Sequence, residues 1–304
     1  MTPDKETHHH IQGYLLVLGA ATLWGTLGLF YTGLNRHYRV SPQAIAFFRA
    51  CIALLILLAA LACFRRDQLR IHPRQLPLLI AQGVIGIAAF YLLYASAVLT
   101  AGMSVAVVLL YTAPVWVTLF AWLFLNEGLD RYKIIALIGA IVGAALVAQV
   151  YHLQNLNWPG IMLGLGSGLC YACYSIFNKY ALRSYSPWTI LTWALIFGLP
   201  VLAWAQNQQE IWQVLATPGA LLWLVVMGLG PTLGAGVLYA AGLARLPASI
   251  ASIVVALEPV VASLLAFSVL GERLAVAQVI GAAITILSIA LLGGHDLIAK
   301  ANAR

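Results

Sequence analysis

Long apolar stretches alternate with short polar or Pro/Gly-rich breaks along almost the whole chain. Each stretch has about 20 residues, the length that an α-helix needs to cross the hydrocarbon core of a bilayer. The stretches run over residues 11–33, 42–63, 76–99, 103–125, 132–150, 158–182, 187–206, 219–243, 247–270 and 274–293. Since several breaks hold only a few residues, consecutive helices must be antiparallel. The pattern predicts an all-α integral membrane protein with ten transmembrane helices.

The composition supports a membrane location. Of the 304 residues, 62% are apolar and only 8% are charged, so a water-soluble fold would expose large apolar patches. The first apolar stretch follows Asp4, Lys5 and Glu6 and is longer than the hydrophobic region of a cleavable signal peptide. We therefore expect it to be a spanning helix. The four cysteines lie in or at the edges of predicted helices, which makes a disulfide framework improbable.

The formal net charge of +7 is read as a topology signal, because cytoplasmic loops of membrane proteins are enriched in Lys and Arg. With the N-terminus inside, one side collects Lys5, Arg65, Arg66, Arg70, Arg74, Arg131, Lys133, Lys179, Arg183, Arg245, Lys300 and Arg304. The other side collects Arg36, Arg39 and Arg273. This asymmetry predicts that both termini are cytoplasmic. It gives no reason to expect a nucleic-acid partner.

The two halves of the chain repeat with a shift of 145 residues. Pro114 corresponds to Pro259 and Glu127 to Glu272 in this alignment, which runs without gaps over residues 83–129. Coincident Pro and Glu positions are hard to obtain by chance, even between apolar helices. The pattern therefore predicts a duplication, with one five-helix unit at 1–152 and a second at 153–304.

An odd number of helices in each unit has a consequence for topology. The second unit must enter the membrane from the other side, so the two repeats are expected to be inverted. Inverted repeats supply two similar conformations that expose a central site to opposite faces in turn. The duplication therefore favours a transporter that works by alternating access.

Two corresponding segments share one motif. LLYTAPVWVTLFAWLFLNEGL (109–129) and VVALEPVVASLLAFSVLGERL (254–274) each have a mid-helix proline, an apolar run and a closing (N/G)E turn. With LWGTLGLF (23–30) and AFFRACIALL (46–55), the chain resembles the EamA-type family of the drug/metabolite transporter superfamily over nearly its whole length. The resemblance implies ten helices in two inverted repeats and a bacterial inner-membrane location. It also implies export of amino acids, other metabolites or drugs.

Two charged residues lie well inside predicted spans. Glu258 is some twelve residues from either helix end, where a carboxylate is costly unless it is paired, protonated or hydrated. It would bind a substrate ammonium group, exchange a proton, or act as a structural partner for a buried cation or helix end. Arg49 would hold a substrate carboxylate or tie its helix to neighbouring groups, and the family's own FR at this place favours the structural role.

Aromatic and helix-breaking residues complete the candidate site. The proposed substrate-binding residues are Trp24, Arg49, Phe90, Tyr94, Tyr111, Tyr174, Tyr239 and Glu258. Prolines and glycines that recur at equivalent depths in both halves are typical of interrupted helices near a binding site. The proposed hinge residues are Pro114, Pro259, Gly83, Gly86, Gly228 and Pro231. Helix packing remains the alternative for any single aromatic or glycine.

The sequence thus predicts a secondary transporter that exports small amphipathic metabolites, foremost amino acids with aromatic or hydrophobic side chains. Drugs, nucleobases and other metabolites are the alternative cargo. A membrane enzyme for lipid-linked substrates would need a polar catalytic cluster, which the spans do not offer. The absence of a GxxxxGK[ST] stretch argues against direct ATP coupling, and no cofactor or metal is expected. The partners are the lipid bilayer and the small-molecule substrate, with the protein acting as a monomer or a homodimer.

Overall fold

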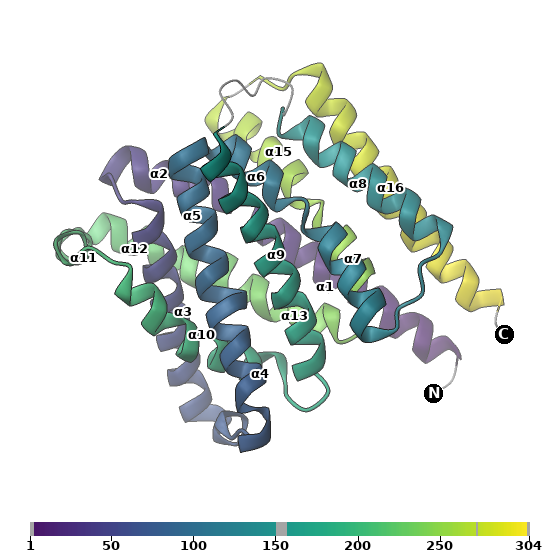
Figure 1. Cartoon of the computed structure of the whole chain (residues 1–304), viewed down its shortest axis with the longest axis horizontal. Coiled ribbons are helices and arrows are strands. Elements are labelled where there is room, and N and C mark those ends of the chain that lie inside the picture. Colours follow the sequence, from purple (N-terminus) through teal and green to yellow (C-terminus); the bar gives the residue numbers. More distant parts are fainter. Residues whose placement is uncertain (1–2, 150–156, 272, 303–304) are drawn as a thin grey trace.

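Helices account for the regular structure of the first half. The structure, a computed structural model, describes residues 3–149, 157–271 and 273–302 (Figure 1). The first half contains α1 (Pro3–Gly25), α2 (Leu27–Tyr38), α3 (Pro42–Phe64), η1 (Arg66–Leu69), η2 (Pro73–Gln75), α4 (Leu76–Ala81), the π-helical η3 (Gln82–Ala89), α5 (Phe90–Ala101), α6 (Met103–Leu110), α7 (Ala113–Leu125) and α8 (Arg131–Val147).

The second half repeats most of this order with a shift of 145 residues. It contains α9 (Trp158–Ala181), α10 (Pro187–Trp204), α11 (Gln208–Leu215), α12 (Pro218–Met227), the π-helical η5 (Gly228–Gly234), α13 (Ala235–Leu243), α14 (Ala248–Val255), α15 (Glu258–Leu270) and α16 (Val276–Asn302). After the shift, α6 and α7 have the same bounds as α14 and α15. The predicted duplication is therefore confirmed at the level of individual helix ends.

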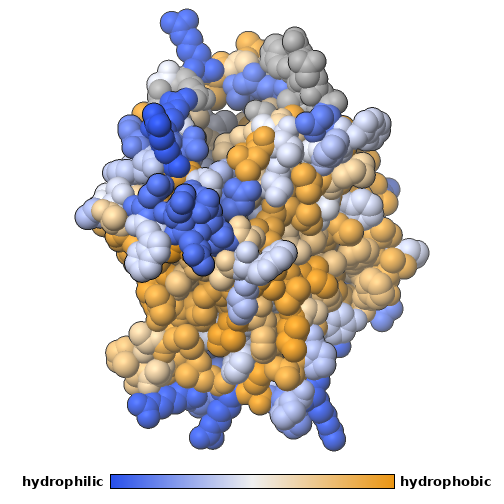
Figure 2. Space-filling model, turned by 60° about the vertical axis from the view of Figure 1, so that its left-hand side comes forward, coloured by the Kyte–Doolittle hydropathy of each residue, from blue (hydrophilic) through white to orange (hydrophobic). Residues whose placement is uncertain are grey.

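The chain is an all-helical membrane protein. Among the described residues, nine helical stretches are long and apolar enough to cross a bilayer, and some of them join two elements, as α1 and α2 do in His8–Tyr38. The predicted fifth span corresponds to α8, whose 17 residues lie at the short end of the spanning range. Figure 2 shows apolar side chains as a broad belt between two polar ends. Such a belt matches the hydrocarbon core.

The equivalent helices α3 and α10 show that the halves are inverted. Ser41, which caps the start of α3, donates through its backbone N–H (2.7 Å) and its hydroxyl (2.9 Å) to Glu210, beyond the end of α10. Ser186, which caps the start of α10, donates through its hydroxyl to Gln68, just beyond α3 (2.9 Å). Each helix therefore begins where the other ends, so the two packed helices run antiparallel.

The connections 65–75, 126–130, 182–186 and 244–247 lie on one face of the molecule, since hydrogen bonds join them or the helix ends beside them. This face is called the basic face because of the residues Arg65, Arg66, Arg70, Arg74, Arg183 and Arg245. The other end of the molecule is called the opposite face. That the basic face is cytoplasmic remains a prediction from the positive-inside rule.

Two spanning helices are broken in the middle of the membrane. The break between α6 and α7 lies at Tyr111–Thr112, and the break between α14 and α15 at Ala256–Leu257. Pro114 and Pro259 follow as the second residues of α7 and α15. A proline has no backbone N–H and is tolerated in the first turn of a helix, where that donor would have no partner. The prolines therefore start new helices in the centre of the bundle.

The last helix of each half packs against its counterpart. α8 and α16 run side by side (Figure 1), with the Gln278 side chain donating to the Val147 carbonyl (3.1 Å) at one end. Between their ends the two backbones approach closely at glycines. A Cβ added to Gly281 would lie 2.6 Å from the carbonyl oxygen of Gly143. Only a residue without a side chain fits there.

This contact predicts the effect of substitutions along α16. Gly281→Ala should lower the free energy of unfolding by about 1–3 kcal/mol, because its methyl group meets backbone that cannot move aside. Gly294→Ala is the matched control on the same helix, since a Cβ there meets nothing within 4 Å. Thermal unfolding of the purified protein in detergent, followed by tryptophan fluorescence, measures both. Equal melting temperatures for the two variants would contradict the close crossing.

Candidate functional site

A cavity of about 500 Å³ lies between the two halves, where the broken helices meet. It reaches Met103, Ala148 and Ala266 toward the opposite face and extends inward to Tyr174 on α9. The basic-face connections do not contribute to its lining within the described residues. The cavity is therefore directed toward the opposite face. Its size is within the range typical of small-molecule sites.

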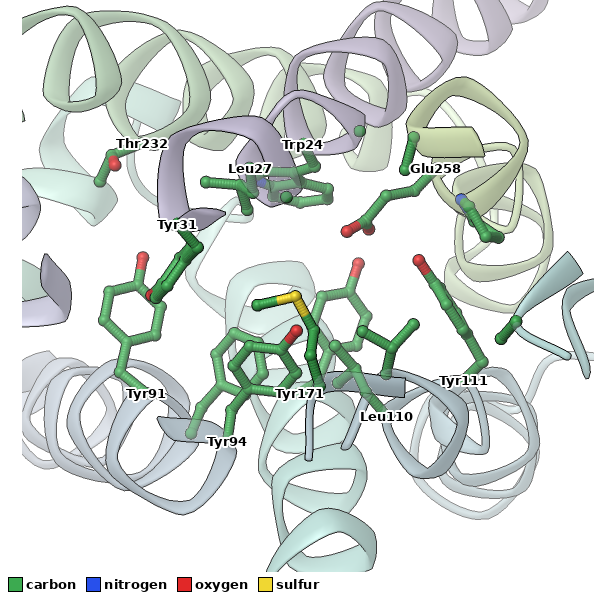
Figure 3. Close-up of a pocket in the computed structure, with 18 of the residues that line it drawn as sticks. Trp24, Leu27, Tyr31, Tyr91, Tyr94, Leu110, Tyr111, Tyr171, Thr232 and Glu258 are labelled. Atoms are coloured by element: carbon green, nitrogen blue, oxygen red, sulfur yellow. The ribbon is translucent and has the colours of Figure 1, made fainter. Parts of the chain in front are cut away.

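Glu258 supplies a carboxylate to this cavity. It is the first residue of α15, directly after the break at Ala256–Leu257, and its side chain points into the cavity beside Trp24 and toward Tyr111 (Figure 3). A charged group at the centre of a membrane helix costs about 2.5–3.5 kcal/mol on insertion scales. The positive end of the α15 dipole and the polar surroundings of the cavity both reduce this cost. The local fold thus explains how an acidic residue is accommodated there.

Arg49 contributes a positive charge from α3. Its side chain is only 5% exposed, and its guanidinium lies 4.1 Å from the centroid of the Tyr91 ring. The positive charge of the guanidinium also interacts electrostatically with Tyr31, Tyr94 and Glu258. Its Nε is buried without a hydrogen-bond partner among the described residues. Arg49 therefore belongs to the cavity wall, held by tyrosine rings, with donor capacity left unused.

Eight aromatic side chains contribute to the remaining wall. The ring of Trp24 lies 6.2 Å from that of Tyr171 and 5.3 Å from that of Tyr239, measured between centroids. Phe90 also packs against Tyr171, with 5.7 Å between the ring centroids. Such contacts fix large side chains in place and leave a surface that is apolar in its body and polar at the hydroxyl tips.

Seven of the eight predicted substrate-binding residues line the cavity: Trp24, Arg49, Phe90, Tyr94, Tyr111, Tyr174 and Glu258. The eighth, Tyr239, lies behind the wall. It is fully buried, stacks on Tyr174 at 6.1 Å and shares a 2.8 Å hydrogen bond with the Ser175 hydroxyl. Its place indicates that it supports the cavity wall without facing a ligand.

The predicted hinge residues lie at irregular points of the backbone. Gly83 and Gly86 are in the π-helical η3, and Gly228 and Pro231 are in the π-helical η5. A Cβ at Gly83 would lie 2.5 Å from the Ala194 carbonyl oxygen, so this glycine also permits close packing against α10. π-helical turns often occur at functional sites. Whether these residues act as hinges remains a prediction.

Several cavity residues were not among the predicted set: Leu27, Tyr31, Tyr91, Leu110, Tyr171 and Thr232. Helical spacing contains a signal for some of them. Trp24, Leu27 and Tyr31 follow one another at intervals of three and four residues and therefore share a helix face. Thr232 has no such signal, because it lies in a π-helical segment whose register cannot be read from an α-helical period.

Comparison with known proteins gives one consistent result. The model of the EamA-like transporter family matches residues 11–149 and again 158–294. The chain is 27% identical to the uncharacterized transporter YwfM of Bacillus subtilis, over 91% of this chain and 92% of that protein. An uncharacterized transporter of Archaeoglobus fulgidus is 29% identical over 68% of this chain and 74% of its own length.

A solved crystal structure shares the fold. It superposes with a TM-score of 0.79 at 18% sequence identity and covers 92% of this chain and 96% of its own. At this identity the likeness concerns the fold alone.

The hydrogen bond between Tyr239 and Ser175 behind the cavity wall gives a prediction. Tyr239→Phe should lower the free energy of unfolding by about 0.5–1.5 kcal/mol, since a buried hydrogen bond to Ser175 is lost. Ser175→Ala removes the same bond from the other side. The double variant should therefore cost less than the sum of the two single variants in thermal or denaturant unfolding. Strictly additive costs would mean that this bond does not couple the two side chains.

Proposed function

The chain belongs to the EamA-like transporter family and is a secondary transporter, and on this premise we propose that it exports small amphipathic metabolites, foremost amino acids. The resemblance to this family that the sequence indicated is confirmed by the two family matches. The proposed process is alternating access, in which the central cavity opens to one face of the membrane at a time. Members of transporter families are in general not enzymes.

The observation that carries the proposal is Glu258 inside an aromatic-walled cavity. A carboxylate at this place binds the ammonium group of an amino acid through charge-assisted hydrogen bonds. Trp24 and Phe90 offer rings to an apolar side chain, which suits aromatic or hydrophobic amino acids. The positive potential around Arg49 favours the substrate carboxylate. The cavity thus offers a binding partner for the ammonium group, the carboxylate and the apolar side chain of an amphipathic zwitterion.

The predicted orientation assigns the described structure to one step of the proposed export cycle. If the basic face is cytoplasmic, the cavity described here opens outward and is the state from which cargo is released. The protein would then reside in a bacterial inner membrane with both termini inside, as a monomer or a homodimer. Drugs and nucleobases remain alternative cargo, because rings and one carboxylate also accommodate organic amines and heterocycles.

The proposal predicts that Glu258→Gln strongly reduces transport without unfolding the protein. Uptake of labelled amino acids into proteoliposomes should fall by at least about tenfold, because hydrogen bonds to a charged group contribute about 1.5–3 kcal/mol. Asp67→Asn is a matched control, since this carboxylate is exposed on the basic face and distant from the cavity lining. Its uptake rate should equal that of the unaltered protein.

A panel of labelled amino acids, nucleobases and organic cations identifies the cargo class in the same assay. Selective uptake of aromatic or hydrophobic amino acids supports the proposal. Unchanged uptake by folded Glu258→Gln would remove Glu258 from the binding step, and uptake of only nucleobases or cations would replace amino acids as the cargo.

A further inference from the structure

Glu127 makes a contact that joins the two halves far from the cavity. It follows α7 on the basic face, and its carboxylate accepts hydrogen bonds from the backbone N–H groups of Ala248 (2.6 Å) and Ser249 (3.1 Å). The hydroxyl of Ser249 donates to the same carboxylate at 2.5 Å. The first N–H groups of a helix have no partner within the helix, and its N-terminus carries a positive partial charge. Glu127 therefore holds the start of α14 with three charge-assisted bonds.

Two further contacts close the basic face around this point. The Lys179 ammonium group, near the end of α9, donates to the carbonyls of Leu243 and Leu246, both at 2.6 Å. The Tyr180 hydroxyl donates to the Phe124 carbonyl at 2.5 Å. Together with Glu127, these bonds tie α7, α9 and the α13–α14 connection together. We call this set of contacts the basic-face latch.

The equivalence of the two halves indicates that the latch can open. α6 and α15 are the counterparts of α14 and α7, residue for residue, and inversion places them at the opposite face. α14 packs against α7, whereas α6 and α15 stand on either side of the cavity and both line it. Equivalent helix pairs are thus closed on one face and separated on the other within the described ranges. Exchanging the two arrangements would open the basic face.

A polar side chain is buried between the cavity and the latch. Asn178 on α9 follows Tyr174 of the cavity wall and precedes Lys179 and Tyr180 of the latch. It is 1% exposed, and its amide Nδ2 makes no well-formed hydrogen bond among the described residues, although it interacts with the Tyr174 hydroxyl. A buried amide without a well-formed hydrogen bond is costly in the closed arrangement and would be hydrated if this face opened. Asn178 thus marks the blocked inner half of a pathway.

We propose that Glu127 is a positioning residue of the transport cycle, whose carboxylate keeps the basic face closed and must release α14 before that face opens. This proposal rests on the proposed function, since it presupposes alternating access. It assigns a role to the (N/G)E turn at the end of the fourth helix, which does not line the cavity. The corresponding Glu272 of the second half lies outside the described residues, and the proposal does not depend on it.

The test measures access to two positions without using any substrate. In a variant whose four native cysteines are replaced, Asn178→Cys reports on the inner half and Ser263→Cys reports on the open cavity. Each is labelled with a hydrophilic maleimide in nanodiscs, with and without Glu127→Gln. Labelling of Cys at position 178 should accelerate by about tenfold and labelling at position 263 should slow, because destabilising one state raises the population of the other.

A matched control separates this effect from general loosening. Glu210 binds the start of α3 through Ser41 with the same chemistry, but on the opposite face and away from the α7–α14 pair. Glu210→Gln should leave labelling at position 178 unchanged. If Glu127→Gln does not fold, Ser249→Ala removes only the hydroxyl bond and should produce a smaller shift in the same directions.

The outcomes distinguish this inference from the proposed function. Unchanged labelling in folded Glu127→Gln and Ser249→Ala would overturn the latch, even in a protein that transports amino acids. A rise at both positions, or an equal rise in Glu210→Gln, would overturn it as well, since that pattern indicates loosening. Opposite shifts at the two positions support the latch even if the amino-acid panel shows no uptake.

Discussion

The hydrocarbon core provides no hydrogen-bond partner for the polypeptide backbone, and the arrangement of this protein depends on that constraint. Continuous helices meet it by pairing their own groups, so irregular backbone is tolerated only where protein or a wet cavity surrounds it. The breaks at Tyr111–Thr112 and Ala256–Leu257 satisfy this condition, because they lie inside the bundle beside the cavity. The helix breaks and the cavity therefore satisfy this hydrogen-bonding constraint together.

The same helix breaks determine where the buried carboxylate lies. A helix that starts in the middle of the membrane directs its positive end toward the cavity, and Glu258 occupies the first position of that helix. Its counterpart in the first half is Ala113, so the duplicated scaffold carries an unduplicated carboxylate. The scaffold is nearly symmetric, whereas the site is not. Ligand chemistry could thus diverge in one half while the helix ends stayed in register.

The two halves differ mainly in how their helices pack, and in one helix that is interrupted in the first half only. The first helix is interrupted at Thr26, between α1 and α2, while its counterpart α9 is continuous through the equivalent Tyr171. α2 borders the cavity at the opposite face, and the end of α9 is fixed at the basic face through Lys179 and Tyr180. A single duplicated sequence pattern therefore supports both a closed and an open arrangement in one molecule.

The sequence by itself determined much of the fold. Because a helix in a bilayer forms its backbone hydrogen bonds locally, the length of each apolar stretch directly indicates a spanning helix. The spans and the duplication could be read in this way, the paired prolines indicated that two helices are irregular, and the inversion follows from the odd number of helices. Part of the cavity lining could be found too, since Glu258 and Arg49 are rare at that depth and the aromatics cluster around them.

Only the tertiary structure decided which ring faces the cavity and which face is closed. Tyr239 repeats the position of Tyr94, yet it is buried against Trp24 and Tyr174, whereas Tyr94 lines the cavity. Glu127 binds a helix end 121 residues away, a contact that no local pattern encodes. Such contacts depend on how the two halves dock, and the sequence records each half's helices far better than the packing between them.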